Sequence, residues 1–279
     1  MTQDNLRNEI DPYDLKELQK YFDPYVFNSL SELTFSEIQW TRLAIAFWDI
    51  SGFSDLCNKL TDKPVHFVSF LKEYSDEGSR IINGRKGILD KYIGDGIMAY
   101  FGYQGKYAAS GPNEALLAAL EFRDKFREIK DRYESLWLSD LGKRTDINLK
   151  CGMHVGYVFF GLFETERRKQ ITVLGPNANL ASRLEHDVAV KDEIIVSEEL
   201  KNMAKDNFSF EPKPVEKPLK AFEDIKTVFK LTGIERFQET TPIADVIRYF
   251  NGTCPKCMNS TRPIGLILPK CSACGFSVT

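Results

Sequence analysis

The chain has 279 residues, enough for one large domain or for a domain of about 200 residues with an appendage. Hydrophobic residues make up 43% of it and charged residues 28%, a composition typical of a soluble globular protein with a substantial core. The 37 basic and 40 acidic residues give a formal net charge of -3, which excludes a global attraction to nucleic acid or to an acidic membrane.

No apolar run approaches the ~18 residues of a membrane span, and the N-terminus is too polar and acidic for a signal peptide. We therefore expect a cytoplasmic protein without a membrane span, and nucleic acid is not an expected partner. Of the six cysteines, Cys57 and Cys151 are isolated, whereas the other four stand in two close pairs near the C-terminus. This spacing indicates a metal site rather than a disulfide framework.

The pattern divides the chain into four parts. We predict a helical lead over 1–40, a domain over 41–233, a linker with a short helix over 234–250, and a compact module over 251–279. The lead alternates apolar and charged residues at helical spacing, and Pro24 marks a break between two short helices.

The domain is predicted to begin with a buried strand, LAIAFWDI, that ends in the acidic residue Asp49. A helical stretch follows from Ser51-Gly52 to about Asn83, with a junction at Pro64. The runs GILDKYI and GIMAYF then form a hairpin, and Glu114 to Leu138 is a strongly amphipathic helix.

The second half of the domain reads as strands in INLKCGMHVGYVFFGLF and ITVL, a helix containing Asn179 to Leu184, the strand EIIVS, the helix SEELKNMAK and the strand DIKTVFKL. The order β-α-β-β-α-β, with later additions, predicts an α+β sheet covered by helices, of the ferredoxin-like kind.

Two segments carry candidate metal ligands. In FWDISGFS, Asp49 ends a buried strand just before a helix start at Gly52 and Phe53, where phosphates can rest on backbone N–H groups. The alternative is that Asp49 simply caps this helix. In LDKYIGDGIMAYF, strand alternation places Lys91 and Asp95 on one side, and Asp49 with Asp95 is a carboxylate pair suited to Mg²⁺. The alternative for Gly94-Asp95-Gly96 is an ordinary turn.

Two further segments carry candidate phosphate ligands. Asn179 and Arg183 stand four residues apart and share one helix face, where they suit a phosphoryl group whose charge grows in a transition state. The alternative is a solvated arginine on an exposed face. Lys220 precedes the last strand. By itself such a lysine is expected to face solvent, and it becomes a candidate phosphate ligand only together with the other residues.

Taken in this order, the segments resemble the class III nucleotidyl cyclase catalytic domain, the family of adenylate and guanylate cyclases. The resemblance covers roughly Leu43 to Leu231 and rests on FWDISGF, LDKYIGDGIMAYF, GMHVGYVFFG and ITVLGPNANLASRLE. KYFDPYVFNSL also looks like the short helical lead that often precedes this domain. The conjunction is far more specific than any single motif.

The resemblance implies roles for the candidate residues. Asp49, Asp95 and the carbonyl of Ile50 would bind two Mg²⁺ or Mn²⁺ ions, Asn179 and Arg183 would act on the ribose and the α-phosphate, and Lys220 would bind the terminal phosphates. Gly52 and Phe53 would also contact the substrate. Lys91 and Thr172 match the pair that reads the purine, and a lysine that donates to adenine N1 favours ATP.

In this family the metal ligands come from one chain and the remaining groups from its partner, so the resemblance implies a homodimer with composite active sites. The implied reaction forms 3′,5′-cyclic AMP and pyrophosphate from ATP with the help of two metal ions. A cyclase for GTP or a pyrimidine nucleotide, and a non-catalytic scaffold, are the alternatives. Trp48, Pro176 and Gly161-Leu162-Phe163 depart from the family pattern, and Trp48 and Pro176 could reshape the pocket or the dimer contacts.

The C-terminal module contains CPKC and CSACG, two Cys-x-x-Cys knuckles separated by thirteen residues. Four thiolates, from Cys254, Cys257, Cys271 and Cys274, match one tetrahedral structural Zn²⁺ site, a zinc ribbon. Either pair lacks the surrounding βαβ pattern of a redox motif. The module has three basic residues and no acidic one, which is weak support for nucleic-acid binding, and a zinc-stapled fold that docks an unknown partner is the favoured interpretation.

Overall fold

A computed structural model of the chain describes residues 38–103, 109–142, 144–167, 169–204 and 208–234. The chain divides after Gly233 into two compact units. Apart from Ile234, the described residues belong to the first unit. The predicted linker over 234–250 and the zinc module over 251–279 lie outside the described residues, as does the helical lead over 1–40 except for its last three residues.

In chain order, the elements are β1 (Gln39–Ser51), α4 (Phe53–Lys59), α5 (Pro64–Gly84), β2 (Gly87–Ile93), β3 (Gly96–Phe101), α6 (Gly111–Leu141), β4 (Asn148–Glu164), β5 (Lys169–Leu174), α7 (Pro176–Arg183), the π-helical turn η2 (Leu184–Val188), β6 (Ile194–Val196), α8 (Glu198–Met203), β7 (Phe208–Pro214) and β8 (Thr227–Ile234).

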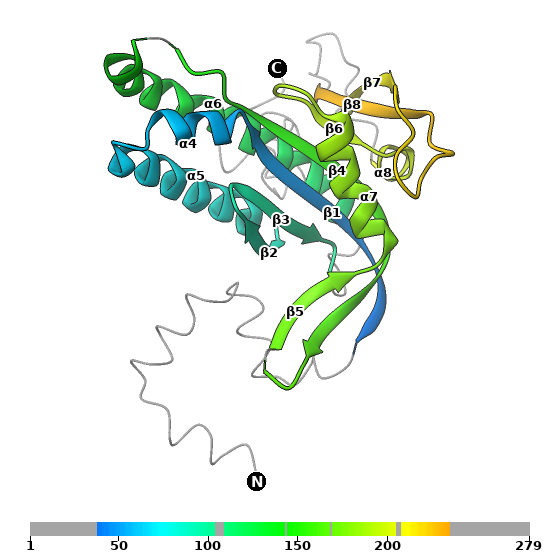
Figure 1. Ribbon diagram of the computed structural model, residues 1–279. Helices are drawn as coiled ribbons and strands as arrows, with labels where there is room; N and C mark the ends of the chain where they lie inside the picture. The colour runs from blue at the N-terminus through cyan, green and yellow to red at the C-terminus, as the bar shows by residue number, and fades with distance from the viewer. Residues whose placement is uncertain (1–37, 104–108, 143, 168, 205–207, 235–279) are drawn as a thin grey trace, which may run out of the picture. The chain divides into compact units, whose positions relative to one another are not determined.

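The strands of the described residues form one eight-stranded sheet with the order β2-β3-β1-β4-β6-β8-β7, and β5 pairs with β4 (Figure 1). β1 is antiparallel to β4 along its whole length, from Gln39 opposite Phe160 to Ser51 opposite Asn148. β6 then pairs parallel to β4. The long β1/β4 pairing is the centre from which the site residues are positioned.

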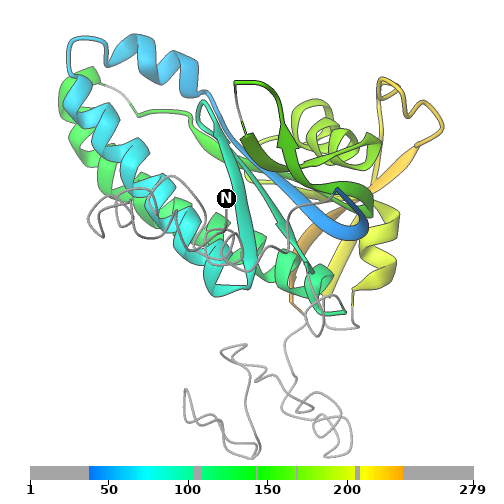
Figure 2. The same cartoon turned by 90° about the horizontal axis from the view of Figure 1, so that it is seen from below.

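Helices α5 and α6 lie side by side and pack on one face of the sheet (Figure 2). The core that the helices and the sheet enclose is aromatic. The Trp48 ring of β1 meets the Phe122 ring of α6 edge-on at 5.8 Å, and the Phe70 ring of α5 meets the Trp137 ring of α6 at 5.0 Å. These four side chains are at most 1% exposed. Such aromatic pairs add about 0.5–1.5 kcal/mol each beyond the apolar area that they bury.

The opposite face of β1 packs against α7. Leu43 and Ile45 share a buried cluster with Val158 of β4 and with Ala178 and Ala181 of α7. The small alanine side chains let the helix approach the sheet closely. The functional groups on α7 are therefore anchored to the central strands.

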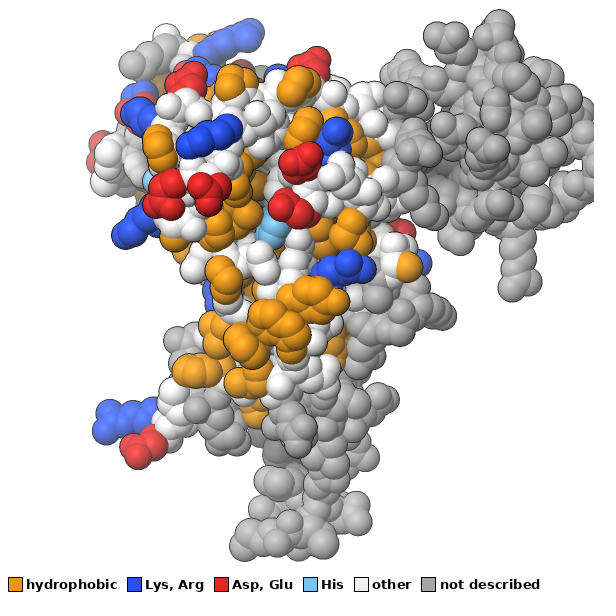
Figure 3. Space-filling view, turned by 90° about the vertical axis from the view of Figure 1, so that its right-hand side faces the viewer, with side chains coloured by type: hydrophobic (Ala, Val, Ile, Leu, Met, Phe, Trp, Pro, Cys, Tyr) orange, Lys and Arg blue, Asp and Glu red, His pale blue; other side chains and the backbone are white. Residues whose placement is uncertain are grey.

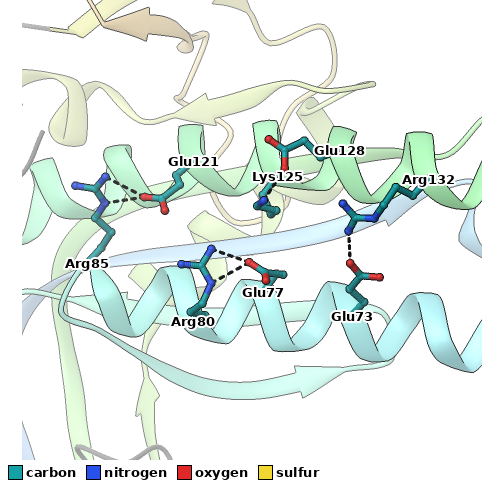
Figure 4. A network of polar contacts seen from close by, with 8 residues as sticks. All are labelled: Glu73, Glu77, Arg80, Arg85, Glu121, Lys125, Glu128 and Arg132. Atoms are coloured by element: carbon teal, nitrogen blue, oxygen red, sulfur yellow. Dashed lines mark hydrogen bonds and ion pairs between the residues drawn. The ribbon is translucent and has the colours of Figure 1, made fainter. Parts of the chain in front are cut away.

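Ion pairs join α5 to α6 on their outer surface (Figure 4). Arg132 of α6 pairs with Glu73 of α5, and Arg85, directly after α5, pairs with Glu121 of α6 at 2.9 Å. Because these side chains are partly exposed, each pair contributes only about 0.2–1 kcal/mol. The buried aromatic rings therefore dominate the packing of the two helices.

The mixed α+β architecture predicted from the sequence is confirmed, including the helix junction at Pro64 and the hairpin over 87–101. Two features differ from the prediction. β7 was not predicted, because its sequence FSFEPKP contains two prolines that are atypical of a strand interior; it lies at the edge of the sheet, where proline is tolerated. α7 ends at Arg183 and continues into a π-helical turn.

Among the helices of the described residues, none is both long and apolar enough to cross a membrane.

Candidate active site

Two carboxylates meet at the end of β1. Asp95 lies in the turn between β2 and β3, and its Oδ2 accepts a hydrogen bond from the backbone N–H of Ile50 at 3.2 Å. Burial raises the pKa of Asp95 to about 6, and the nearby charge of Asp49 adds to the effect. The fold thus brings together the two carboxylates that the sequence singled out.

A cation stands beside this pair. Lys150 of β4 is directly opposite Asp49 in the antiparallel register, and its Nζ lies 3.4 Å from Asp49 Oδ2 and 2.7 Å from Glu185 Oε1. Burial acts to lower the pKa of Lys150, but the carboxylates of Glu185 and Asp49 outweigh it and raise the pKa. Lys150 therefore offsets negative charge at the Asp49 end of the site.

The helix after Asp49 begins where the sequence predicted. Gly52 is the N-cap residue of α4, with φ of 80°, and Phe53 is its first residue. A Cβ at Gly52 would lie 2.6 Å from the Asp146 backbone oxygen, so both the conformation and the space require glycine. The N-cap position of α4 belongs to Gly52, so Asp49 does not occupy the capping position that the alternative assigned to it.

The carboxylate pair fits a hard divalent cation. Mg²⁺ commonly relies on one or two carboxylates together with substrate phosphates, and oxygen atoms are its preferred ligands. Asp49 and Asp95 supply two carboxylates beside the backbone of Ile50. No group of three or more His, Cys, Asp or Glu side chains in the described part of the chain forms a closed metal site.

A second cluster lies where β2 approaches β5. Lys91 Nζ donates a hydrogen bond to Thr172 Oγ1 at 3.1 Å, although the two residues are 81 positions apart. Thr172 is buried, and the Lys91 side chain is partly exposed. The predicted base-reading pair is therefore assembled within one chain.

Lys91 and Asp95 do not share a side of a strand in the way that alternation predicted. β2 ends at Ile93, so Asp95 belongs to the turn, and a bulge interrupts β2 between Leu89 and Lys91. Lys91 is directed to β5, whereas Asp95 is directed to the end of β1. The two charged residues of this hairpin thus serve different clusters.

The third cluster is a cavity of about 590 Å³ beside α7. Asn179 and Arg183 line it from α7, and Lys220 lines it from the loop before β8. Arg183 also pairs with Asp187 of the π-helical turn at 3.5 Å. The three groups predicted to contact phosphates and ribose therefore share one open space.

The structure explains two of the departures from the family pattern, Trp48 and Pro176. Trp48 is 1% exposed and points to the α5/α6 side of the sheet, because side chains alternate along β1. It therefore belongs to the core and does not line the α7 cavity. Pro176 is the first residue of α7 and lines that cavity, a position where proline is favoured.

Three polar residues of these clusters escaped the sequence reasoning: Lys150, Glu185 and Asp90. Asp90 gave a signal, since it is a second charged residue inside the apolar run GILDKYI. Lys150 and Glu185 gave none, because only the β1/β4 register brings Lys150 opposite Asp49. The four cysteines of the predicted zinc site lie outside the described residues.

The fold and the site together define a mixed α+β domain with a carboxylate pair, a polar pair between β2 and β5, and a cationic cavity beside a short helix. Residues 37–231 match the family model described as the adenylate and guanylate cyclase catalytic domain. The chain belongs to this family.

Individual relatives agree with this assignment. Over 180 residues the chain is 26% identical to an adenylate cyclase of Anabaena cylindrica, a match that covers 64% of this chain but only 34% of that relative. The structure is similar to that of the adenylyl cyclase CyaB from P. aeruginosa, with a TM-score of 0.65 and 25% identity over 72% of this chain and 98% of that one. The guanylyl cyclase Cya2 shares the fold at a TM-score of 0.61 and 21% identity, covering 71% and 95% of the two chains.

Proposed function

We propose that the protein is an adenylate cyclase, which converts ATP to 3′,5′-cyclic AMP and pyrophosphate. The hydrogen bond between Lys91 and Thr172 carries the proposal. An ammonium donor suits the unprotonated N1 of adenine, and guanine presents an N–H at that position instead. Membership of the cyclase family and the relatives named adenylate cyclase support the same activity.

In the proposed reaction the ribose 3′-oxygen attacks the α-phosphorus. The 3′-hydroxyl gives up its proton to solvent water, the O3′–P bond forms, and the bond from the α-phosphorus to the bridging oxygen breaks as pyrophosphate leaves. Arg183 and Asn179 would stabilise the charge that grows on the α-phosphoryl group and orient the ribose, while Lys220 would hold the terminal phosphates.

Asp49 and Asp95, with the carbonyl of Ile50, would hold two Mg²⁺ or Mn²⁺ ions. When bound, such ions make the 3′-hydroxyl more acidic and neutralise charge on the triphosphate. Gly52 and Phe53 would position the phosphates beside these carboxylates.

We further propose that two copies form a homodimer with composite active sites. An apolar patch supports this arrangement: Trp40, Tyr157, Phe159, Phe163 and Leu174 of β1, β4 and β5 are each at least 42% exposed. Figure 3 shows apolar side chains gathered on this side of the molecule. Within this patch the Trp40 ring stacks on the Tyr157 ring, with centroids 5.8 Å apart. Contiguous exposed apolar patches commonly mark interaction surfaces.

The test is to incubate the purified protein with Mg²⁺ or Mn²⁺ and each nucleoside triphosphate, and to identify the products by mass spectrometry. Cyclic AMP as the main product is expected. Cyclic GMP or a cyclic pyrimidine nucleotide as the main product would favour the rival substrates, and no cyclic product at concentrations that support dimers would favour a non-catalytic scaffold.

Exchanging Lys91 for glutamate tests the base reader. Lys91→Glu is expected to lower the ATP-to-GTP ratio of kcat/KM by about tenfold or more, because the carboxylate accepts from guanine N1 and repels adenine N1. An unchanged ratio in a folded variant would contradict the assignment.

The zinc site at Cys254, Cys257, Cys271 and Cys274 stays a prediction. One equivalent of zinc by elemental analysis, lost in Cys254→Ser, would support it. A cytoplasmic location also stays a prediction.

A further inference from the structure

A wholly buried carboxylate lies behind the Lys91–Thr172 pair. The Asp90 side chain is 0% exposed, and its Oδ2 lies 3.0 Å from Lys91 Nζ and 3.2 Å from Thr172 Oγ1. Asp90 is the extra residue of the bulge in β2, since Leu89 pairs with Ala99 and Lys91 with Met98. The bulge allows two consecutive side chains to reach the same strand, β5.

The hydrogen-bonding capacity of the three groups fixes their roles. An ammonium has only donors, so Thr172 Oγ1 accepts from Lys91. An ionised carboxylate has only acceptors, so the single hydroxyl hydrogen of Thr172 is donated to Asp90. Burial raises the pKa of Asp90, and the charge of Lys91 and the hydroxyl of Thr172 oppose this rise.

One lone pair of Thr172 Oγ1 and one N–H of Lys91 then remain for a ligand. A free threonine hydroxyl can either donate or accept, and so cannot distinguish a 6-amino group from a 6-oxo group. With its hydrogen committed to Asp90, the same hydroxyl can only accept.

We propose that Asp90 is a positioning residue that sets purine specificity by holding the Thr172 hydroxyl as a hydrogen-bond acceptor. The adenine 6-amino group can donate to this oxygen, whereas the 6-oxo group of guanine or hypoxanthine would face it with a second acceptor. Asp90 therefore selects at position 6 without touching the base. This inference rests on the proposed cyclase function and on the assignment of Lys91 and Thr172 to the base.

A purely structural role, holding β2 to β5, would affect all nucleotides equally. The test therefore compares two substrates that differ only at position 6: N6-methyl-ATP, which offers an N–H, and 6-methoxypurine riboside triphosphate, which offers an ether oxygen. Both have an unprotonated N1 and similar bulk, so the contribution of Lys91 is common to both. The readout, measured at pH 8.5, is the ratio of the two kcat/KM values. Taking the ratio cancels the fraction of enzyme that is active.

We expect the unmodified protein to prefer N6-methyl-ATP by about tenfold, the contribution of one hydrogen bond. Asp90→Leu removes the acceptor and fills the buried space with an apolar side chain. It should bring the ratio to within about threefold of unity, because the Thr172 hydroxyl can then rotate and donate. Asp90→Asn keeps an acceptor oxygen and should retain the preference. Glu193→Gln removes another mostly buried carboxylate, paired with Lys213 elsewhere, and should also retain it.

Equal use of the two analogues by the unmodified protein would overturn the proposal, and this measurement needs no variant to fold. An unchanged ratio in folded Asp90→Leu, or a fall in Asp90→Asn as large as in Asp90→Leu, would overturn it as well. Cyclisation without a preference would reject this inference alone. No cyclic product from ATP or either analogue would reject the proposed function and this inference with it.

Discussion

At the scale of single residues, the site depends on charged groups that are held by one another. Asp49 faces both Asp95 and Lys150, and Lys150 in turn faces the buried carboxylate of Glu185. Glu185 also lines the α7 cavity. Within a single protein chain, Lys150 and Glu185 thus connect the carboxylate pair to that cavity.

Removing Lys150 is expected to destabilise the protein. Breaking a buried ion pair costs about 3–5 kcal/mol, and the partial exposure of Asp49 lowers our expectation for Lys150→Met to about 2 kcal/mol. Urea unfolding in the presence of EDTA measures the loss. The double variant Lys150→Met/Glu185→Leu should regain most of it, since no buried charge is then unpaired. Equal losses in the single and double variants would show that packing rather than charge is responsible.

His154 gives the stability of the domain a pH dependence. Its Nδ1 lies 2.7 Å from Ser197 Oγ and its Nε2 lies 2.9 Å from Asn177 Oδ1, and burial lowers its pKa below the usual 6.5. Below about pH 6.5 the unfolded chain therefore binds a proton that the native side chain resists, and stability falls as the pH falls.

His154 by itself contributes a slope that approaches about 1.4 kcal/mol per pH unit for one proton, and the raised pKa of Asp95 contributes a slope of opposite sign in the same pH range. Free energies of unfolding between pH 7.5 and 5 measure it. His154→Gln should be less stable at pH 7.5 and should show a smaller slope, whereas the exposed His186→Gln should keep the slope of the unmodified protein. The same slope in His154→Gln would assign it to other groups.

At the scale of elements, the position of α7 against the sheet decides where Asn179 and Arg183 lie. His154 of β4 reaches Asn177 in the first turn of α7, and the Asn177 side-chain amide donates to the Tyr157 backbone oxygen at 2.7 Å. Further along, α7 and the π-helical turn pass directly over Gly152 of β4. The helix is therefore held at both of its ends by one strand.

Gly152 is expected to be indispensable for this packing. A Cβ there would lie 2.1 Å from the Glu185 backbone nitrogen and 2.5 Å from the Ala181 backbone oxygen, and neither atom can move without shifting the helix. We expect Gly152→Ala to cost about 3 kcal/mol of stability and to reduce turnover through displacement of Arg183.

Gly84→Ala is the matched control: a Cβ at Gly84, the last residue of α5, meets nothing within 4 Å, and alanine there should be neutral or slightly stabilising. Thermal unfolding and turnover of both variants check the prediction.

At the scale of the whole molecule, the clusters raise the question of which chain completes each site. Among the described residues, no hydrogen bond or ion pair joins Lys91 or Thr172 to Asp49 or Asp95. The exposed aromatic patch of β1, β4 and β5 offers a surface for a second copy. The proposed homodimer, in which each chain supplies one half of each site, would use this surface.

Complementation tests the composite site. Asp95→Asn and Arg183→Ala should each be nearly inactive, because each destroys both sites of its homodimer. Mixing them in equal amounts should restore about a quarter of full activity, since half of the dimers are then mixed and each has one intact site. Mixing Asp49→Asn with Asp95→Asn should restore nothing, because both changes affect the same half. No recovery in the first mixture, despite exchange of subunits, would contradict the composite site.

The sequence alone indicated the α+β class and the order of most elements, and the resemblance to the cyclase family added the residues of the proposed site. Those signals are local: a buried strand that ends in Asp49, a Gly-Asp-Gly turn at Asp95, and a helix that presents Asn179 and Arg183 on one face. Each depends on periodicity or on turn chemistry, which short stretches of chain encode by themselves.

Only the tertiary structure showed which of these groups have polar partners. Strand register places Lys150 opposite Asp49, and the bulge in β2 turns Asp90 as well as Lys91 toward Thr172. Register and bulges arise from pairing between segments far apart in the chain, so no local pattern specifies them. The residues that we expect to do the chemistry were therefore visible in the sequence, whereas the residues that hold and orient them became visible only in the folded chain.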